Sequence, residues 1–152
     1  MFKDLKRVKN QMNHESAIEL LKNCREGVLG TISSNGYPYT VVVNYVLYNN
    51  EVYFHSAKEG HKIDNIINNP KVSFTVYDNV RIIEEKFTTK YQSVTLFGKA
   101  TLLPGNKKIL MELIKKYSPE FLKSGKDYVA KSFDTTTLVK IDIEHLTGKE
   151  RL

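Results

Sequence analysis

The sequence has a single cysteine, no tryptophan and no long apolar run. The lone thiol, Cys24, has no partner for a disulfide within the chain or for a zinc site of paired cysteines, so we expect a reducing compartment. No segment approaches the roughly 18 apolar residues that a membrane-spanning helix needs, and the basic N-terminal stretch lacks the apolar core of a signal peptide. We therefore expect a cytoplasmic protein without a membrane partner.

Charge of one sign is not concentrated anywhere in the chain. The 23 lysines and arginines are scattered among 17 acidic residues, which leaves a formal net charge of +6. No basic run and no aromatic signature of RNA recognition is present, so a nucleic-acid partner is not expected and remains the weakest alternative. A length of 152 residues without internal repeats is typical of one domain, which we expect to span residues 1–152.

Alternating apolar residues predict six strands, and turn residues predict how they are joined. The strands are expected over residues 28–33, 37–48, 51–55, 71–77, 91–103 and 139–143. Ser34-Asn35-Gly36 and Asn49-Asn50 are typical of hairpin turns. Residues 78–90 show no clean period and are expected to form a connection. Gly98, inside a strand, predicts a bulge or a close approach of another group.

Helical spacing of apolar residues predicts short helices around this sheet. They are expected over 14–25 with Asn13 as N-cap, over 61–69, after Gly105-Asn106, from Ser118-Pro119 to a stop at Gly125, and over 127–131. Cys24 then lies on a buried helix face. Strands joined by hairpins with helices at the margins predict an antiparallel β-barrel, a mainly β (α+β) fold, because closing a sheet removes its edges. An open α+β sheet is the structural alternative.

The segment that follows the third predicted strand carries the strongest chemical cluster. A loop with a flexible glycine, a hydroxyl and cations leads directly into a helix, whose free amides and dipole favour an anion. The residues are His55, Ser56, Lys58, Gly60, His61 and Lys62. Judged by spacing alone, an anion site and a solvated surface turn are equally well supported. No two histidines show a metal-ligand spacing with a carboxylate, so no metal site is expected.

Four segments, in order along the chain, resemble one known family. They are GVLGTISSNGYPYTVVVNY, VYFHSAKEGHKIDNI followed by NPKVSF, YQSVTLFGKA, and IDIEHLTGKER. With them the sequence resembles the flavin-binding split β-barrels related to pyridoxamine-phosphate oxidase, and in particular the nitroimidazole-resistance branch. The resemblance implies a six-stranded antiparallel split β-barrel. It also implies a homodimer that holds two FMN molecules at the subunit interface.

The resemblance assigns expected roles to individual residues. Tyr39, Thr40, Val41 and Val42 would line the isoalloxazine ring, and His55, Ser56 and Ala57 would hold the ribityl-phosphate side. Lys62 would pair with the phosphate, in the cluster that also holds Lys58 and His61. Gln92 and Ser93 would complete the site from this chain or from its partner. Gly148 and Lys149 recur in the family and are expected to be structural.

The resemblance implies an FMN-dependent oxidoreductase. A nicotinamide cofactor or another donor would reduce the flavin, and a small-molecule acceptor such as a 5-nitroimidazole would receive the electrons. His55 matches the histidine that the nitroimidazole-resistance branch places beside flavin and substrate, so it is the expected catalytic residue, donating a proton or a hydrogen bond. The alternative is a non-catalytic module of the same fold that holds FMN, haem or another tetrapyrrole as a sensor, store or carrier.

Overall fold

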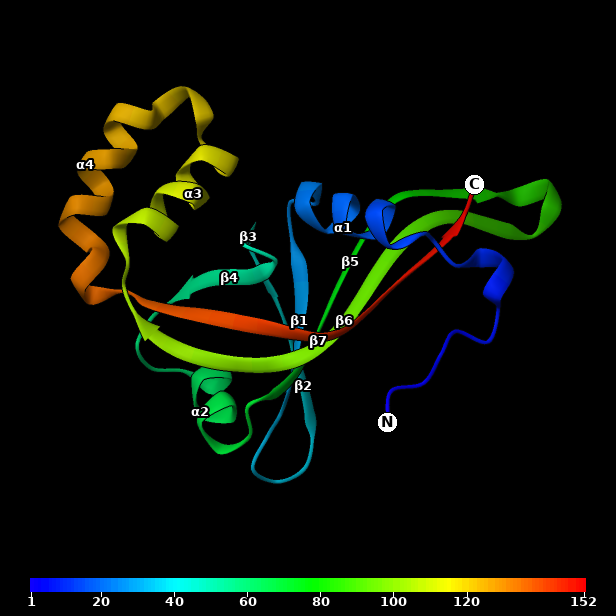
Figure 1. Ribbon diagram of the computed structural model, residues 1–152, viewed down its shortest axis with the longest axis horizontal. Helices are drawn as coiled ribbons and strands as arrows, with labels where there is room; N and C mark the ends of the chain where they lie inside the picture. Colours follow the sequence, from blue (N-terminus) through cyan, green and yellow to red (C-terminus); the bar gives the residue numbers. More distant parts are fainter.

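The sheet has seven strands, and every strand runs antiparallel to its neighbours. The structure is a computed structural model that describes residues 1–152. Its strands are β1 (Gly27–Ile32), β2 (Pro38–Val43), β3 (Val46–Tyr48), β4 (Glu51–Ser56), β5 (Lys71–Ile83), β6 (Thr88–Pro104) and β7 (Thr137–Arg151). Their hydrogen-bonded order is β2-β1-β5-β6-β7-β4-β3 (Figure 1). The mainly β, antiparallel prediction is confirmed, and the predicted count of six strands is wrong.

The additional strand arises because the predicted strand over 37–48 breaks at Asn44 and Tyr45. β2 pairs with β1, whereas β3 pairs with β4. At the break the Tyr45 side chain is fully buried, and its hydroxyl donates to the carbonyl of Leu21. β2 and β3 are the two edge strands of the sheet. A closed barrel would need hydrogen bonds between them, but only the two residues Asn44 and Tyr45 connect them. The expectation that closure removes the sheet edges is therefore also wrong.

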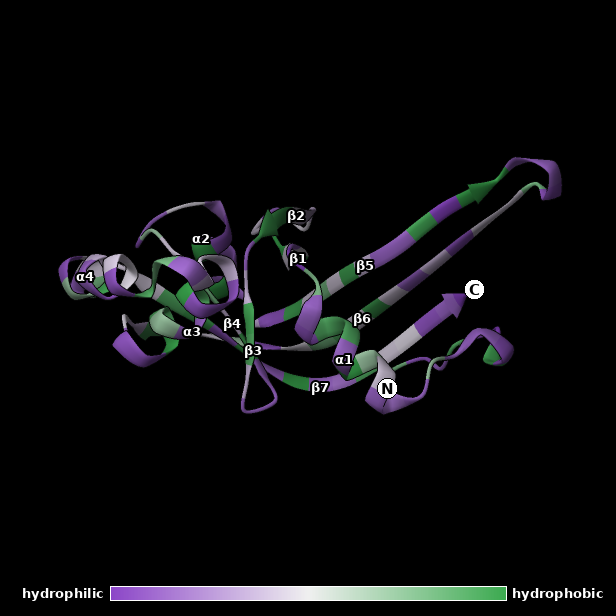
Figure 2. Ribbon diagram, turned by 90° about the horizontal axis from the view of Figure 1, so that it is seen from above, coloured by the Kyte–Doolittle hydropathy of each residue, from purple (hydrophilic) through white to green (hydrophobic).

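Residues 78–90, predicted as a connection, mostly belong to strands. β5 continues to Ile83, a 3₁₀ turn spans Glu84–Lys86, and β6 begins at Thr88. The resulting arm projects from the rest of the molecule (Figure 2). Its side chains include apolar groups that are largely exposed: Tyr77 by 64%, Val80 by 54%, Ile82 by 70% and Phe87 by 96%. No face of the arm packs on the core, so its sequence carries no period of two.

Glycines permit two close approaches that position β7. The register of β6 against β7 shifts between Phe97 and Gly98, which confirms the predicted bulge. A Cβ at Gly98 would lie 2.1 Å from the carbonyl oxygen of Asp142, so only glycine fits there. A Cβ at Gly148 would lie within 2.9 Å of side-chain atoms of Met12 and Ala17, in line with the structural role expected for this glycine. β7 is also much longer than the predicted segment 139–143.

Four α-helices surround the sheet. They are α1 (His14–Asn23), α2 (His61–Asn68), α3 (Lys107–Tyr117) and α4 (Leu122–Ser132), with further 3₁₀ turns at Val8–Asn10, Pro119–Phe121 and Phe133–Thr135. The predicted N-cap at Asn13 is confirmed, because its side chain accepts from the Ser16 amide at 2.8 Å. Asn106 caps α3 in the same way and accepts from the Ile109 amide at 3.1 Å. Gly125 was predicted to end a helix but lies inside α4. A Cβ there would meet Ile114 of α3 at 2.4 Å, so the glycine permits close packing of α3 and α4.

The main core fills the curled sheet, and helices contribute to it from opposite ends. Leu20 and Leu21 of α1 enter at one end and Ile63 and Ile66 of α2 at the other (Figure 1). Cys24 is buried in this core as predicted, and burial raises the pKa of its thiol. A smaller cluster on the outside of the sheet is covered by α3 and α4. None of the helices is both long and apolar enough to cross a membrane.

Candidate functional site

The segment from β4 to α2 forms a strand, a short loop and an uncapped helix. β4 ends at Ser56 and α2 begins at His61. Gly60 precedes the helix with φ 145° and ψ 171°, a conformation that side chains disfavour, and no side chain accepts a hydrogen bond from the first turn of α2. The starts of α1 and α3 are capped by Asn13 and Asn106, whereas α4, like α2, begins without a side-chain cap. The first amides of α2 therefore remain available to an anionic group.

The Ser56 hydroxyl is buried without a hydrogen-bond partner at the start of this loop. The residue is 7% exposed, and its Oγ has neither donor nor acceptor within reach. An unsatisfied buried hydroxyl costs roughly 1–3 kcal/mol, so native proteins rarely keep one without a reason. A polar ligand in the loop would satisfy it, and this fits the phosphate side of a nucleotide.

His55 lies at the end of β4, just before the loop, and Lys62 lies in the first turn of α2, just after it. His55 keeps solvent access at the end of β4, yet partial burial of its ring lowers the pKa of His55, and the nearby Lys62 ammonium lowers it further. The imidazole is therefore neutral at pH 7. A neutral imidazole both donates and accepts a hydrogen bond, which suits a group beside a redox-active ring.

Contacts of His61 connect α2 to the β1–β2 hairpin. Its ring lies 3.9 Å, centroid to centroid, from that of Tyr39, and its Nε2 lies 3.0 Å from Ser33 Oγ. Asn65, one turn further along α2, donates to Thr31 Oγ1 at 2.9 Å and reaches Ser33 Oγ at 3.3 Å. These contacts bring β2 next to the loop, as the predicted site requires. No local pattern predicts the roles of Ser33, Thr31 or Asn65, because their pairing is set by tertiary packing.

Strand β2, which carries Tyr39, Thr40, Val41 and Val42, lies at an edge of the sheet. It has one neighbouring strand, so the peptide groups on its other side are unpaired. Tyr39 and Val41 turn inward and are half-buried, whereas Thr40 and Val42 turn outward and are exposed. The four side chains therefore do not line one surface. The free edge of β2 offers a row of backbone donors and acceptors, and Val42 adds a small apolar side chain on the outer face of the strand.

Gln92 and Ser93 lie far from the loop within one chain. His55 is opposite Leu138 of β7, and Leu138 is opposite Leu103 of β6. Eleven residues of strand separate Leu103 from Gln92, which corresponds to on the order of 35 Å along β6. Gln92 instead donates to Glu150 Oε2 at 2.9 Å near the base of the arm. A single chain does not bring these two residues together with Lys62.

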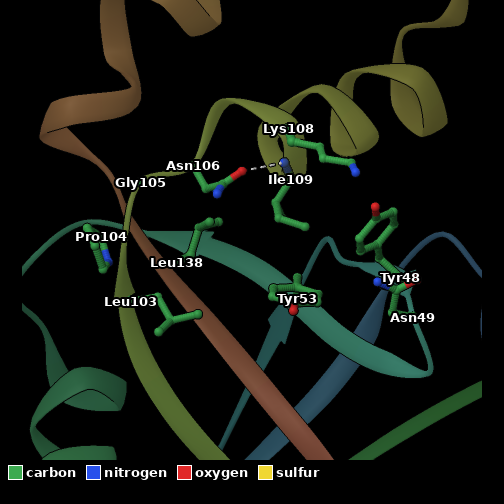
Figure 3. A pocket seen from close by; sticks show the side chains of 10 residues that line it. All are labelled: Tyr48, Asn49, Tyr53, Leu103, Pro104, Gly105, Asn106, Lys108, Ile109 and Leu138. Carbon is green, nitrogen blue, oxygen red and sulfur yellow. Dashed lines mark hydrogen bonds between the residues drawn. The ribbon is translucent and has the colours of Figure 1, made fainter.

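A cavity of about 490 Å³ lies on the outer side of the sheet (Figure 3). The β3–β4 turn, the ends of β6 and β7 and the first turn of α3 surround it. Tyr53 lines this cavity and lies on the same face of β4 as His55, two residues away. None of the residues predicted for the site lines it. The sequence did not reveal this cavity, because its walls come from segments that are distant along the chain.

The family of the chain follows from comparison with known sequences. Residues 13–150 match the family described as pyridoxamine 5'-phosphate oxidase. The chain belongs to this family. The resemblance inferred from the four segments is thereby confirmed, and the seven-stranded sheet is this family's split barrel. No curated protein matches the sequence.

Solved structures share the fold at low sequence identity. A conserved hypothetical protein from Mycobacterium tuberculosis superposes with a TM-score of 0.83 and 17% identity, covering 97% of this chain and 90% of that one. A putative 5-nitroimidazole antibiotic resistance protein from Bacteroides thetaiotaomicron gives 0.74 and 18%, covering 91% and 85%. An FAD-binding protein from Mesorhizobium loti gives 0.66 and 22%, covering 93% and 97%. At these identities the likeness concerns the fold alone.

Proposed function

We propose that this chain binds FMN as a homodimer and acts as an oxidoreductase on a small electron acceptor. The observation that carries the proposal is the buried, unpartnered hydroxyl of Ser56, which lies between a strand end and the uncapped start of α2. A polar ligand would satisfy this atom, and one solved structure that shares the fold is that of an FAD-binding protein. The charge of the loop also suits a phosphate, because Lys58 and Lys62 lie in or next to it.

The phosphate of the flavin would be held where β4 meets α2. Lys62 provides a charge-assisted contact, and Ser56 provides a buried hydroxyl. Lys58 and His61 add positive charge and a ring nitrogen, while the backbone at Ala57 and the first amides of α2 complete a concave anion site. His61 is already oriented by Tyr39 and Ser33, so this part of the site is preorganised.

The pyrimidine edge of the ring would meet the free edge of β2. Its unpaired peptide groups offer the alternating donors and acceptors that the edge of a flavin ring needs, and Val42 provides an apolar contact. The contact of Tyr39 with His61 fixes the distance between this edge and the phosphate loop. The two halves of the cofactor would thus be held by β2 and by the loop.

A second copy of the chain would complete the site. The arm of β5 and β6 exposes apolar side chains on a ribbon that has no packing partner in one chain, and isolated two-stranded ribbons are marginally stable. Gln92 and Ser93 lie at the base of this arm, far from Lys62 of the same chain. A twofold arrangement in which the arm crosses to the partner covers the apolar groups and delivers Gln92 and Ser93 to the partner's loop.

The chemistry divides between cofactor and protein. Bound flavin supplies electron transfer between a nicotinamide or other donor and an acceptor such as a nitroaromatic compound. His55 remains neutral because of partial burial and the nearby Lys62 charge, and its ring N–H donates a hydrogen bond to the acceptor. The protein orients the acceptor beside His55 and limits the access of water to it.

The experiment that tests this function is anaerobic reduction followed by oxidation with candidate acceptors. Purified protein should show oxidised-flavin absorbance after addition of FMN, bleach with a nicotinamide donor, and recover its colour when a 5-nitroimidazole is added. His55→Gln should retain the flavin and slow the recovery. Protein that stays colourless with FMN contradicts the proposal. A sharp haem-like band after addition of haem, without flavin binding, would instead favour the non-catalytic module.

A further inference from the structure

The cavity beside α3 has an apolar floor and an aromatic wall. Leu138 and Ile109 form part of the floor and are 1% and 7% exposed. Tyr48 and Tyr53 stand at its side, with ring centroids 6.4 Å apart and ring planes inclined by 66° (Figure 3). A volume of about 490 Å³ lies within the range of small-molecule sites, roughly 300–1,000 Å³. Apolar and aromatic surfaces of this kind accept a flat ring.

One cation at the rim of the cavity, Lys108, has no carboxylate partner. Lys108 has its Nζ 5.4 Å from the centroid of the Tyr48 ring and forms no salt bridge. The Tyr48 phenol raises the pKa of Lys108. The Tyr53 hydroxyl donates to Glu51 Oε2 at 2.8 Å, and Glu51 does not line the cavity.

The amides at the start of α3 are not the groups that would bind an anion in this cavity. The Asn106 side chain already accepts a hydrogen bond from the Ile109 amide at 3.1 Å, so the N-terminus of the helix is capped within the chain (Figure 3). The neighbouring Lys107 turns away and lies 4.6 Å from the centroid of the Phe133 ring. The cation that faces the aromatic wall is therefore Lys108 alone on this turn of the helix.

We propose that this cavity binds a planar aromatic anion, with the ring against Tyr48 and Tyr53 and its carboxylate or phosphate paired with Lys108. The binding goes beyond the proposed flavin site, because no residue assigned to the flavin lines the cavity. The cavity is near that site, because Tyr53, which lines the cavity, and His55 project from the same face of β4. The cavity is thus bounded by the face of β4 that also carries His55, the residue expected to meet the acceptor.

The test uses 2-naphthoate as the aromatic anion and 2-naphthamide as its neutral counterpart, titrated by calorimetry into the full-length, flavin-free protein. The charge contact of Lys108 predicts naphthoate binding roughly two- to fivefold tighter than naphthamide binding. Lys108→Gln should abolish that preference and Lys108→Arg should retain it. Lys107→Gln, one residue earlier on the same helix, should leave it unchanged. Tyr48→Leu should weaken both ligands, because it removes the aromatic wall.

Two outcomes overturn this inference. One is equal affinity of the wild-type protein for the two ligands, and the other is a preference for naphthoate that survives in Lys108→Gln. Circular dichroism of each variant verifies that the fold is retained. Because the titration contains no flavin, its failure leaves the flavin proposal intact. Failure of FMN to bind likewise leaves this result standing.

Discussion

The imidazole of His61 lies against the ring of Tyr39, with 3.9 Å between the ring centroids. One residue begins α2 and the other belongs to the edge strand β2, so the contact joins the two parts of the proposed flavin site. The 3.0 Å approach of His61 Nε2 to Ser33 Oγ fixes the ring from its other side. The loop between β4 and α2 is therefore attached to the sheet at the position where a flavin ring would begin.

Ser56→Ala should act in opposite directions on stability and on cofactor binding. In the flavin-free protein the change removes a buried hydroxyl that has no partner, so the free energy of unfolding should stay level or rise by up to about 1 kcal/mol. In the presence of FMN the same change should weaken binding, because the ligand loses a hydrogen bond. Urea unfolding and FMN titration measure the two effects. A loss of stability in the flavin-free protein would show that Ser56 Oγ has a partner within the chain.

Lys62→Ala should raise the pKa of His55. Partial burial lowers this pKa from the ordinary value of 6.5, and the Lys62 charge lowers it further, so removing the charge allows protonation at higher pH. Titration of the His55 ring protons by NMR, assigned with His55→Gln, measures the change. Lys123→Ala on α4 is the matched control and should leave this pKa where it is. A His55 pKa that ignores Lys62 would contradict their proximity.

The same lowered pKa makes stability depend on pH. Since folding lowers the pKa of His55, the unfolded chain takes up the proton first as pH falls below about 6.5. The contribution of His55 to the free energy of unfolding should therefore decrease through this range and level off below the folded-state pKa. Comparing urea unfolding of the wild type and His55→Gln at several pH values isolates it. Parallel curves for the two proteins would rule out a lowered pKa.

Tyr117→Phe should destabilise the break between β2 and β3. The Tyr117 hydroxyl accepts from the Tyr45 amide at 2.9 Å and lies 2.6 Å from the carbonyl oxygen of Arg25. Without it the Tyr45 amide loses its partner, which should lower the free energy of unfolding by roughly 1–3 kcal/mol. Tyr128→Phe, at a side chain that is 65% exposed, is the control and should have little effect. Equal stability of the two variants would show that the phenol does not hold the break.

Mixed dimers test whether the partner's arm completes the site. Lys62→Ala and Gln92→Ala homodimers should each bind FMN weakly. If Gln92 acts on the partner's loop, a mixed dimer of the two variants contains one intact site and should bind one tight FMN. If both residues act within one chain, every site in the mixed dimer carries a lesion and no tight binding returns. Flavin absorbance per purified mixed dimer distinguishes these results.

Local chemistry in the sequence was enough to predict several elements and part of the site. The left-handed Asn49 and Asn50 form the predicted turn, and the Asn13 cap and the Gly98 bulge are present where single residues predicted them. The predicted order of strand, loop and helix around Ser56 is also present. These features depend on neighbours within a few residues along the chain, which a single sequence displays directly.

Features set by tertiary packing could not be predicted. The apolar alternation continues through Tyr45, so the pattern does not show that the strand exchanges one partner for another there. Residues 78–90 lack a period because the arm has no buried face, although they form strands. Gly125 fits inside a helix because it packs against Ile114, and the cavity beside Lys108 is formed by three separate segments of the chain. Each depends on contacts between residues distant in sequence.

The most direct measurement compares the affinity of the protein for FMN with its affinity for riboflavin, which has the same ring and lacks the phosphate. Two charge-assisted contacts between the loop and the phosphate predict that FMN binds roughly a hundredfold more tightly than riboflavin. Lys62→Ala should weaken FMN binding by roughly tenfold or more and leave riboflavin binding unchanged. Equal affinity for FMN and riboflavin, or an FMN affinity that Lys62→Ala does not alter, would contradict a phosphate site between β4 and α2.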